Sequence, residues 1–339
     1  MAKTKVAING FGRIGRAFLK GSWDREEIEV VAVNDLGNVD NMAYLLKYDT
    51  VYKNWNHDVK VEGGNLVIDG RTVRFVSEKE PTKLPWAELG VDVVVESTGL
   101  FTDFEKAAVH IQAGAKKVVI SAPAKGGEGK VETILMGVNE EKFGTCDVTS
   151  NASCTTNAAS PLIAILDENF GIEKAILNTV HGYTASQSLV DGPSKKDLRE
   201  GRAAAQNIVP SSTGAAIAVT KAFTSLEGLF DGISIRVPVP AGSIVDVTFI
   251  SKKPTNAEEV NNVLREAAKS DRWNNIFSAT DEELVSSDIL GSHFGSIADL
   301  KMTRVVGGNL IKVMAWYDNE AGYTHTLIDH VVKTAKTIK

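Results

Sequence analysis

The sequence predicts a two-domain α/β protein, in which strands and helices alternate before about residue 150 and strands become more frequent after it. Two observations support this fold class. The chain has 339 residues, which is long for one domain. In its first half, apolar runs of strand length alternate with segments whose apolar residues recur at helical spacing. Since no linker rich in Pro, Gly and Ser separates the halves, we expect the boundary where the pattern changes.

The composition restricts the class of protein. A hydrophobic content of 43% and a charged content of 24% are typical of an ordinary globular protein. The net charge of −6 argues against nucleic acid or a membrane surface as the main partner. The two cysteines, Cys146 and Cys154, are too few for a disulfide framework and suit a reducing compartment. With neither a leader segment nor an apolar run of membrane length in sight, we expect a cytoplasmic protein.

The first strand, expected over residues 6–8, leads through a glycine-rich turn into a helix that ends near Gly21. Gly10, Gly12 and Gly15 form a G-x-G-x-x-G pattern between the two elements. The first glycine permits the tight turn, the second lets a pyrophosphate approach the backbone, and the third lets helix and strand pack closely. This context predicts a dinucleotide whose phosphates face the helix N-terminus.

A second strand, expected over residues 29–33, ends at Asn34 and Asp35. Asp35 follows Gly15 by 20 residues, where a carboxylate accepts hydrogen bonds from the adenosine ribose. It would accept from a free 2′-hydroxyl and repel a 2′-phosphate, so NAD is favoured over NADP. The alternative interpretation is a solvated turn residue.

The alternation continues to about residue 120. Ligands in such sheets lie beyond the carboxyl ends of the strands, so Thr98, Gly99 and Ser121 are candidate cofactor contacts, although each is also compatible with an ordinary loop. The expected elements are a helix at 39–47, a three-stranded meander at 59–62, 66–68 and 73–76, a strand at 91–95, a helix at 104–114 and a strand at 117–120.

The change of pattern occurs in residues 150–157, where Cys154 is expected in the first turn of a helix. Unpaired backbone N–H groups and the helix dipole at that end favour the thiolate, which is the nucleophilic form. A buried structural cysteine is the alternative. The Ser, Thr and Asn neighbours shift the balance towards a reactive thiol and leave both interpretations open. Cys146 is expected to have only a packing role.

The second half is richer in strands, and three features in it carry chemistry. His181 ends a strand, and a histidine beside a cysteine can take its proton. Arg236 lies inside a strand and suits a phosphate partner. Hydroxyl and N–H donors that bind phosphate oxygens are supplied by Ser153, Thr155, Thr184, Thr213 and Gly214. A surface histidine and a structural ion pair remain the alternatives for the first two.

The elements expected after residue 166 are strands at 174–181, 233–239, 244–250 and 310–317, and helices at 256–269 and 319–336. A further helix opens at Thr213 and Gly214. The long polar segment 182–202 is expected to be functional, because structureless segments of this length are uncommon inside a domain. The six histidines have no zinc-ligand spacing with the two cysteines, so no metal is expected.

Taken together, these residues resemble the phosphorylating glyceraldehyde-3-phosphate dehydrogenase family. The Ser-Cys-Thr-Thr-Asn core after a full dinucleotide fingerprint is a specific signature, and the similarity covers essentially the whole chain. The segments that carry it are residues 7–16, 150–157, 202–214 and 316–320.

The resemblance implies a Rossmann NAD-binding domain at residues 1–153, joined by the C-terminal helix 319–339. It implies an α+β catalytic domain at 154–318 with a mixed or mostly antiparallel sheet. It also implies a cytoplasmic homotetramer, in which the loop from about residue 183 to 202 lies at subunit contacts and near NAD.

Residue roles follow from matching motif positions. Cys154 is the nucleophile, and His181 is its base and thiol activator. The cofactor positions are Arg13, Ile14, Asp35, Ser121 and Asn319, of which Asn319 orients the nicotinamide carboxamide. Thr184 and Arg236 match the site for the substrate's phosphate. The site for attacking inorganic phosphate is matched by Ser153, Thr155, Thr213 and Gly214.

The chain departs from the family pattern at three places. Lys79 stands where arginine is frequent on the adenine side, and a cofactor contact is still expected there. Arg199 is followed by Glu200, where some relatives carry a second arginine, so Glu200 is not assigned to phosphate. Gly182 follows His181 where Ser or Ala is usual.

The implied reaction is the oxidation of D-glyceraldehyde 3-phosphate by NAD⁺ and phosphate to 1,3-bisphosphoglycerate. It passes through a thiohemiacetal and a thioester on Cys154. One alternative is erythrose-4-phosphate dehydrogenase, in which water resolves the thioester. A different class of alternative is a non-catalytic NAD-binding protein.

Overall fold

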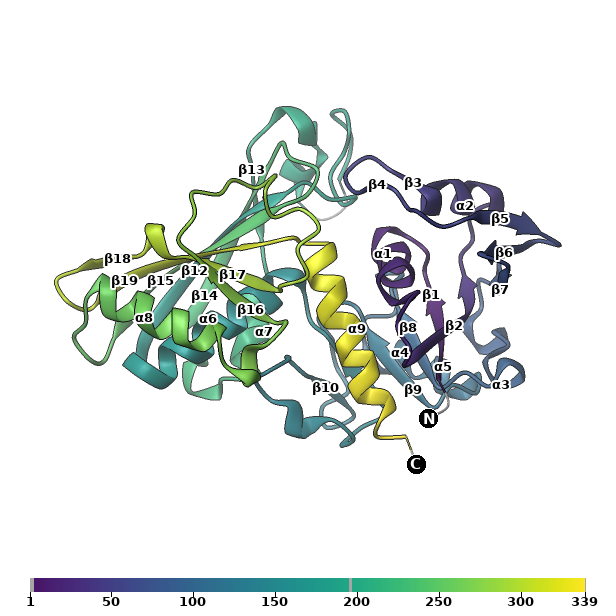
Figure 1. Ribbon diagram of the computed structural model, residues 1–339, viewed down its shortest axis with the longest axis horizontal. Helices are drawn as coiled ribbons and strands as arrows, with labels where there is room; N and C mark the ends of the chain where they lie inside the picture. Colours follow the sequence, from purple (N-terminus) through teal and green to yellow (C-terminus); the bar gives the residue numbers. More distant parts are fainter. Residues whose placement is uncertain (1–2, 195–196, 339) are drawn as a thin grey trace. The chain divides into compact units, whose positions relative to one another are not determined.

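The computed structural model describes residues 3–194 and 197–338 (Figure 1). The chain divides into two compact units. The first comprises Met1–Ile134, Glu140–Ala152 and Thr324–Lys339, and the second comprises Leu135–Asn139 and Ser153–Tyr323. By this division the chain enters the second unit at Ser153 and leaves it at Tyr323, and five residues between Ile134 and Glu140 also belong there.

The first unit is built on a nine-stranded sheet of order β10-β11-β9-β8-β1-β2-β7-β6-β5. The strands from β10 to β7 are parallel, and β6 and β5 add an antiparallel meander. The central strands are apolar runs buried along most of their length, as expected where both faces of a parallel sheet are covered. Their bounds are Thr4–Asn9 (β1), Ile28–Asn34 (β2), Val59–Glu62 (β5), Asn65–Ile68 (β6), Arg71–Val76 (β7), Val93–Glu96 (β8), Lys117–Ile120 (β9), Val131–Thr133 (β10) and Val148–Ser150 (β11).

The first two helices of this unit lie where the sequence predicts them. Helix α1 (Arg13–Ser22) begins directly after the glycine-rich turn. The N-cap of α2 (Val39–Lys47) is Asn38, whose side chain accepts from two first-turn N–H groups. The other elements are a two-stranded ladder of β3 (Tyr48–Asp49) and β4 (Lys53–Asn54), and helices α3 (Trp86–Leu89) and α9 (Ala321–Ala335), the last shared between the units.

The helix predicted at 104–114 is wrong as a single element. It consists of two short helices, α4 (Phe104–Ala107) and α5 (Val109–Gln112). They meet at Ala108, whose ψ of −15° departs from the helical value near −42°. The backbone bond from Ile111 N to Ala108 O tightens the turn there, so the helical ladder is interrupted.

The second unit contains a sheet of order β13-β14-β12-β15-β19-β17-β16, with β18 paired to β19. Most pairs are antiparallel, but β12 and β14 are parallel, as are β16 and β17. The mixed, mostly antiparallel sheet is therefore confirmed. The bounds are Ile172–Gly182 (β12), Val209–Ser212 (β13), Phe230–Val237 (β14), Ser243–Ser251 (β15), Phe277–Thr280 (β16), Ser296–Asp299 (β17), Arg304–Val306 (β18) and Leu310–Tyr317 (β19).

Helix α6 (Cys154–Phe170) packs against this sheet and is buried along most of its length. Ser153 is its N-cap, with a side chain that accepts from Thr156 N at 3.1 Å. The helix therefore starts at Cys154, which places the thiol in the first turn. Helices α7 (Ala215–Thr220) and α8 (Ala257–Ala268) both contact α6.

The polar segment 182–202 contains one short 3₁₀ turn, Leu198–Gly201, and two of its residues lie outside the part of the chain that is described. In the described ranges, no helix is long and apolar enough to cross a membrane.

Candidate cofactor pocket and active site

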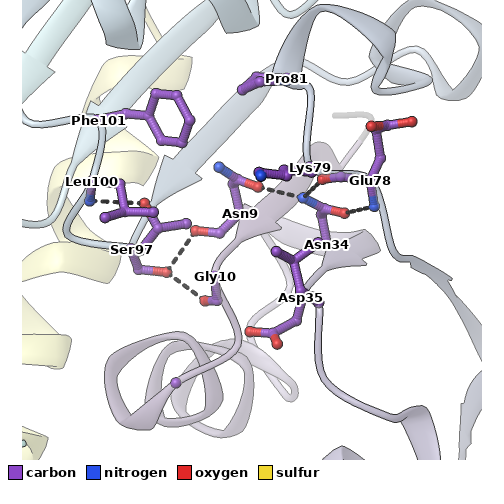
Figure 2. Close-up of a pocket in the computed structure, with 13 residues that line it drawn as sticks. Asn9, Gly10, Asn34, Asp35, Glu78, Lys79, Pro81, Ser97, Leu100 and Phe101 are labelled. Atoms are coloured by element: carbon purple, nitrogen blue, oxygen red, sulfur yellow. Dashed lines mark hydrogen bonds between the residues drawn. The ribbon is translucent and has the colours of Figure 1, made fainter.

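Three neighbouring parallel strands of the first unit end in polar residues at the same level. Asn9 ends β1, Asn34 ends β2 and Glu96 ends β8, and the sheet register pairs Asn9 with both of the others. Beyond these ends lies a cavity of about 450 Å³ (Figure 2). Ligands of parallel α/β sheets bind at this edge. The cavity is lined by Asn9, Gly10, Gly12, Asn34, Asp35, Leu36, Glu78, Lys79, Pro81, Ser97, Thr98, Leu100 and Phe101.

The three glycines of the turn serve different purposes. Gly10 has φ of +94°, and an added Cβ there would lie 2.6 Å from Thr98 N. At Gly15 an added Cβ would lie 2.1 Å from the carbonyl oxygen of Gly10, so the helix packs directly on the turn. At Gly12 an added Cβ would meet nothing within 4 Å. The turn is thus compact on its protein side and open at Gly12, as a bound pyrophosphate requires.

Asp35 is held at the wall of this cavity by backbone donors. Its Oδ2 accepts from Phe11 N at 2.7 Å and its Oδ1 from Gly37 N at 2.8 Å. A carboxylate can accept about four hydrogen bonds, so lone pairs remain for ribose hydroxyls. The cavity therefore fits the adenosine half of NAD.

The other predicted cofactor residues are placed differently. Thr98 lines the cavity, and so does Lys79 (Figure 2). Ile14, Gly99 and Ser121 are not among the lining residues, although Gly99 directly follows Thr98 and Ser121 N donates to Glu96 O at 2.9 Å.

Two further predicted cofactor residues have protein partners. Arg13 is exposed and forms an ion pair with Asp49 at 3.0 Å. Asn319 belongs to the second unit, where its Oδ1 accepts from Gly242 N and from Ser243 Oγ, each at 3.0 Å. Its amide orientation is fixed by these two donors.

In the second unit, the Cys154 thiol meets the His181 ring. The Sγ atom lies 3.4 Å from His181 Nε2. The other ring nitrogen, Nδ1, lies 2.7 Å from the carbonyl oxygen of Gly182 and must donate to it. The proton is therefore on Nδ1, and Nε2 faces the thiol as an acceptor. This is the arrangement that a general base requires.

The electrostatics of the pair differ from the expectation of a resting thiolate. Burial raises the pKa of the Cys154 thiol, opposed by the charge of Arg236 and by hydrogen bonds from Thr155. Burial and then the charge of Arg236 lower the pKa of His181 to about 3, opposed by its bond to Gly182. Both directions favour a neutral thiol beside a neutral imidazole. These directions are opposite to the expected resting thiolate, because loss of hydration outweighs the charge of Arg236 and the hydrogen bonds from Thr155.

Arg236 lies beside His181 because β12 and β14 are parallel and in register, with these two residues as direct partners. Its Nη1 is 3.5 Å from the carbonyl oxygen of Gly182. Its Nε is buried and has no hydrogen-bond partner in the described residues. A half-buried cation with an unsatisfied donor calls for an anionic ligand.

The remaining phosphate candidates fall into three places. Ser153 and Thr155 flank Cys154 on α6, and the Thr155 hydroxyl is buried against Tyr317 OH at 2.9 Å. Thr213 and Gly214 open α7, where Thr213 Oγ1 accepts from Ala215 N at 3.2 Å. Thr184 follows His181 on the next loop and contacts Ser186 at 3.1 Å.

Sequence reasoning missed two residues of the second unit. Tyr317 is buried, its hydroxyl contacts Thr155 and Thr179, and its ring meets that of His181 at a centroid distance of 5.8 Å. Ser243 Oγ accepts from Gly182 N at 3.2 Å and donates to Asn319. Both stand at strand ends, which is a signal that could have identified them.

Several cavity residues of the first unit were also missed, among them Asn9, Asn34 and Glu78. The first two are polar ends of predicted strands, so the rule that selected Thr98 and Ser121 applies to them as well. Cys146 does not line the cavity. It is half-buried, donates to Val148 O at 3.0 Å, and its thiol pKa is raised by burial.

Two family models match the chain. One is described as "Glyceraldehyde 3-phosphate dehydrogenase, NAD binding domain" and matches residues 4–104. The other is described as "Glyceraldehyde 3-phosphate dehydrogenase, C-terminal domain" and matches residues 153–319.

Similar proteins come from a fungus, a cyanobacterium and a bacillus. Glyceraldehyde-3-phosphate dehydrogenase B of Aspergillus oryzae is 47% identical over 326 residues, which cover 96% of each chain. Glyceraldehyde-3-phosphate dehydrogenase 1 of Trichormus variabilis is 48% identical over 331 residues, 97% of this chain and 96% of the relative. Glyceraldehyde-3-phosphate dehydrogenase 1 of Bacillus subtilis is 47% identical over 334 residues, 98% of each chain.

Proposed function

The chain belongs to the glyceraldehyde-3-phosphate dehydrogenase family, and from this premise we propose how its two sites carry out the reaction. It is an NAD-dependent oxidoreductase that acts on D-glyceraldehyde 3-phosphate. We propose that Cys154 and His181 form the catalytic pair and that phosphate releases the product as 1,3-bisphosphoglycerate. The observation that carries the proposal is the 3.4 Å contact between the Cys154 sulfur and His181 Nε2.

The chemistry starts from a neutral pair. As the Cys154 sulfur attacks the aldehyde carbon, its proton passes to His181 Nε2, which has a free lone pair because Nδ1 donates to Gly182. The resulting imidazolium and the Cys154 N–H stabilise the oxyanion of the forming thiohemiacetal. A thiol is needed because the thioester that follows keeps the energy of oxidation for transfer to phosphate.

Bound NAD⁺ would supply the hydride acceptor for oxidation of the thiohemiacetal carbon. The imidazolium first returns its proton to the oxyanion, which gives the thiohemiacetal hydroxyl and a neutral His181. His181 then removes that hydroxyl proton as the carbon is oxidised. The residues proposed to hold the cofactor are those of the glycine-rich turn, the cavity wall and the adjoining strand ends. They are Gly10, Gly12, Arg13, Ile14, Gly15, Asp35, Lys79, Thr98, Gly99 and Ser121. Asn319 is proposed to bind the nicotinamide carboxamide through Nδ2, because its Oδ1 already accepts two protein hydrogen bonds.

Two phosphate sites complete the proposal. Arg236 and Thr184 bind the phosphate of the substrate, which is supported by the unsatisfied Nε of Arg236. The attacking inorganic phosphate is bound by Ser153, Thr155, Thr213 and Gly214. For Thr155 we assign the backbone N–H, since its hydroxyl contacts Tyr317.

We also propose a homotetramer in the cytoplasm. Large apolar side chains are exposed in and near the loop that the family resemblance places at subunit contacts. Leu189 is 82% exposed, Leu198 is 85% exposed and Ile208 is 72% exposed. Apolar surface of this kind supports burial against another copy of the chain. The two free cysteines support a reducing compartment.

The test is the dependence of NADH formation on aldehyde and phosphate. With D-glyceraldehyde 3-phosphate, turnover should require inorganic phosphate and yield an acyl phosphate. Faster turnover of erythrose 4-phosphate, with a carboxylate product and no need for phosphate, would contradict the proposal. Neither the site geometry nor the relatives named above favour that alternative.

A further inference from the structure

Beneath the cofactor cavity, the first unit buries a polar network that the proposed mechanism does not use. Glu96 is 2% exposed and His110 is fully buried, and neither lines the cavity. An ionisable pair in such a place is costly unless every polar atom is hydrogen-bonded.

Trp86 determines which atoms of the network donate and which accept. The indole Nε1–H is only a donor, and it lies 3.2 Å from His110 Nδ1. His110 Nδ1 must therefore accept, which places the ring proton on Nε2. This Nε2–H donates to Glu96 Oε2 at 3.0 Å.

Glu96 then orients the residues around it. Its Oε2 also accepts from Asn9 Nδ2 at 2.6 Å, and its Oε1 accepts from Thr98 N at 2.8 Å and from the Thr98 hydroxyl. All four bonds are donated to the carboxylate. A group that only accepts is therefore required at this position.

Two chains of hydrogen bonds connect Glu96 to the residues of the cavity wall, one through Asn9 and one through Thr98. Because Asn9 gives its Nδ2 to Glu96, its Oδ1 accepts from Asn34 Nδ2 at 2.7 Å, and Asn34 Oδ1 accepts from Glu78 N at 2.9 Å (Figure 2). Because Thr98 gives its hydroxyl proton to Glu96, its oxygen accepts from Leu100 N at 3.0 Å.

We propose that Glu96 and His110 are positioning residues of the cofactor pocket, which set the affinity for the adenosine half of NAD by fixing the orientation of Asn9, Asn34 and Thr98. The inference rests on the proposed function only in taking the cavity as the adenosine site. A Glu96→Gln change replaces an acceptor by an NH₂ donor that faces other donors. The network must then rearrange, and the wall that binds adenosine loses its shape.

The experiment compares two buried histidines of the same unit. His330 is also fully buried, with Nε2 2.8 Å from Thr149 Oγ1, but it does not line the cavity or contact this network. His110→Gln and His330→Gln should lower the thermal midpoint similarly. Only His110→Gln, and more strongly Glu96→Gln, should weaken binding of NAD⁺ and of AMP by about tenfold in calorimetry, with kcat at saturating NAD⁺ within about twofold of the original.

Equal loss of AMP affinity in both histidine variants, or unchanged affinity in Glu96→Gln, would overturn the proposal. If Glu96→Gln does not fold, Trp86→Phe removes only the first donor and should still weaken AMP binding. In ¹⁵N spectra of the unaltered protein, the His110 proton should be on Nε2, and a proton on Nδ1 would contradict the network. AMP binding does not depend on turnover. A failure of the dehydrogenase assay would therefore contradict the proposed function without affecting the test of the network.

Discussion

The cofactor cavity of the first unit and the thiol–imidazole pair of the second are built in different ways. The cavity lies at the aligned ends of neighbouring parallel strands, beside a turn whose glycines fall within six residues. The pair joins a helix start to a strand end 27 residues later, and Arg236 comes from another strand. Cofactor binding in the first unit therefore depends on backbone geometry. The reactivity of the Cys154–His181 pair in the second unit depends on burial beside the charge of Arg236.

Cys154→Ser should have the largest effect on turnover while leaving NAD⁺ affinity almost unchanged. Removal of the nucleophile should reduce turnover on the order of 10⁴-fold or more, since catalytic groups that act as a unit fail together. NAD⁺ affinity should stay within about twofold, because the cavity lies in the first unit. Stopped-flow measurement of NADH and calorimetry with NAD⁺ check both parts. Substantial turnover in this variant would refute the scheme.

The second largest effect should come from His181→Asn. Loss of the general base should slow turnover about 10²–10⁴-fold. It should also move the pH profile of iodoacetate inactivation of Cys154 to higher pH, because the thiol loses its proton acceptor. A purely structural histidine would change stability without moving that profile.

The glycine-rich turn offers a matched pair of substitutions. Gly15→Ala introduces a Cβ 2.1 Å from Gly10 O and should destabilise the protein by about 1–3 kcal/mol. Gly12→Ala meets nothing within 4 Å and should keep the original stability while weakening NAD⁺ binding. Thermal unfolding and calorimetry separate the two outcomes. A stable Gly15→Ala protein would show that the packing argument is wrong.

Acid stability offers a comparison that involves both regions. Burial lowers the pKa of His181 in the second unit and of His330 in the first to about 3. Between pH 6.5 and 3 the unfolded chain binds these protons and the folded chain does not, so stability decreases as pH falls. Each histidine contributes about 1.4 kcal/mol per pH unit in that window.

Denaturant unfolding at a series of pH values checks this expectation. His330→Gln should reduce proton uptake on unfolding by about one in the window from pH 6.5 to 3. The unaltered protein is the reference. Equal slopes for His330→Gln and the unaltered protein would count against a buried neutral His330.

Elements could be predicted from the sequence where the signal for them lies within a few neighbouring residues. The bounds of α2, β9 and β19 agree with those predicted, because capping residues and apolar periodicity are local. The helix predicted at 104–114 is two helices, since nothing in its composition signals the break at Ala108. Tyr317 was missed for another reason: its contacts with Thr155 and Thr179 span more than a hundred residues.

By itself, the sequence determined the alternating fold of the first unit, the glycine turn with Asp35, and the position of Cys154 at a helix start. These features depend on short spacings, since conformational preference acts over a few residues. The tertiary structure alone decided that burial raises the pKa of the Cys154 thiol and lowers the pKa of His181, and that Glu96 and His110 lie beneath the cavity. Burial and strand register are properties of the folded chain, and they determine which groups lose water and which partners they meet.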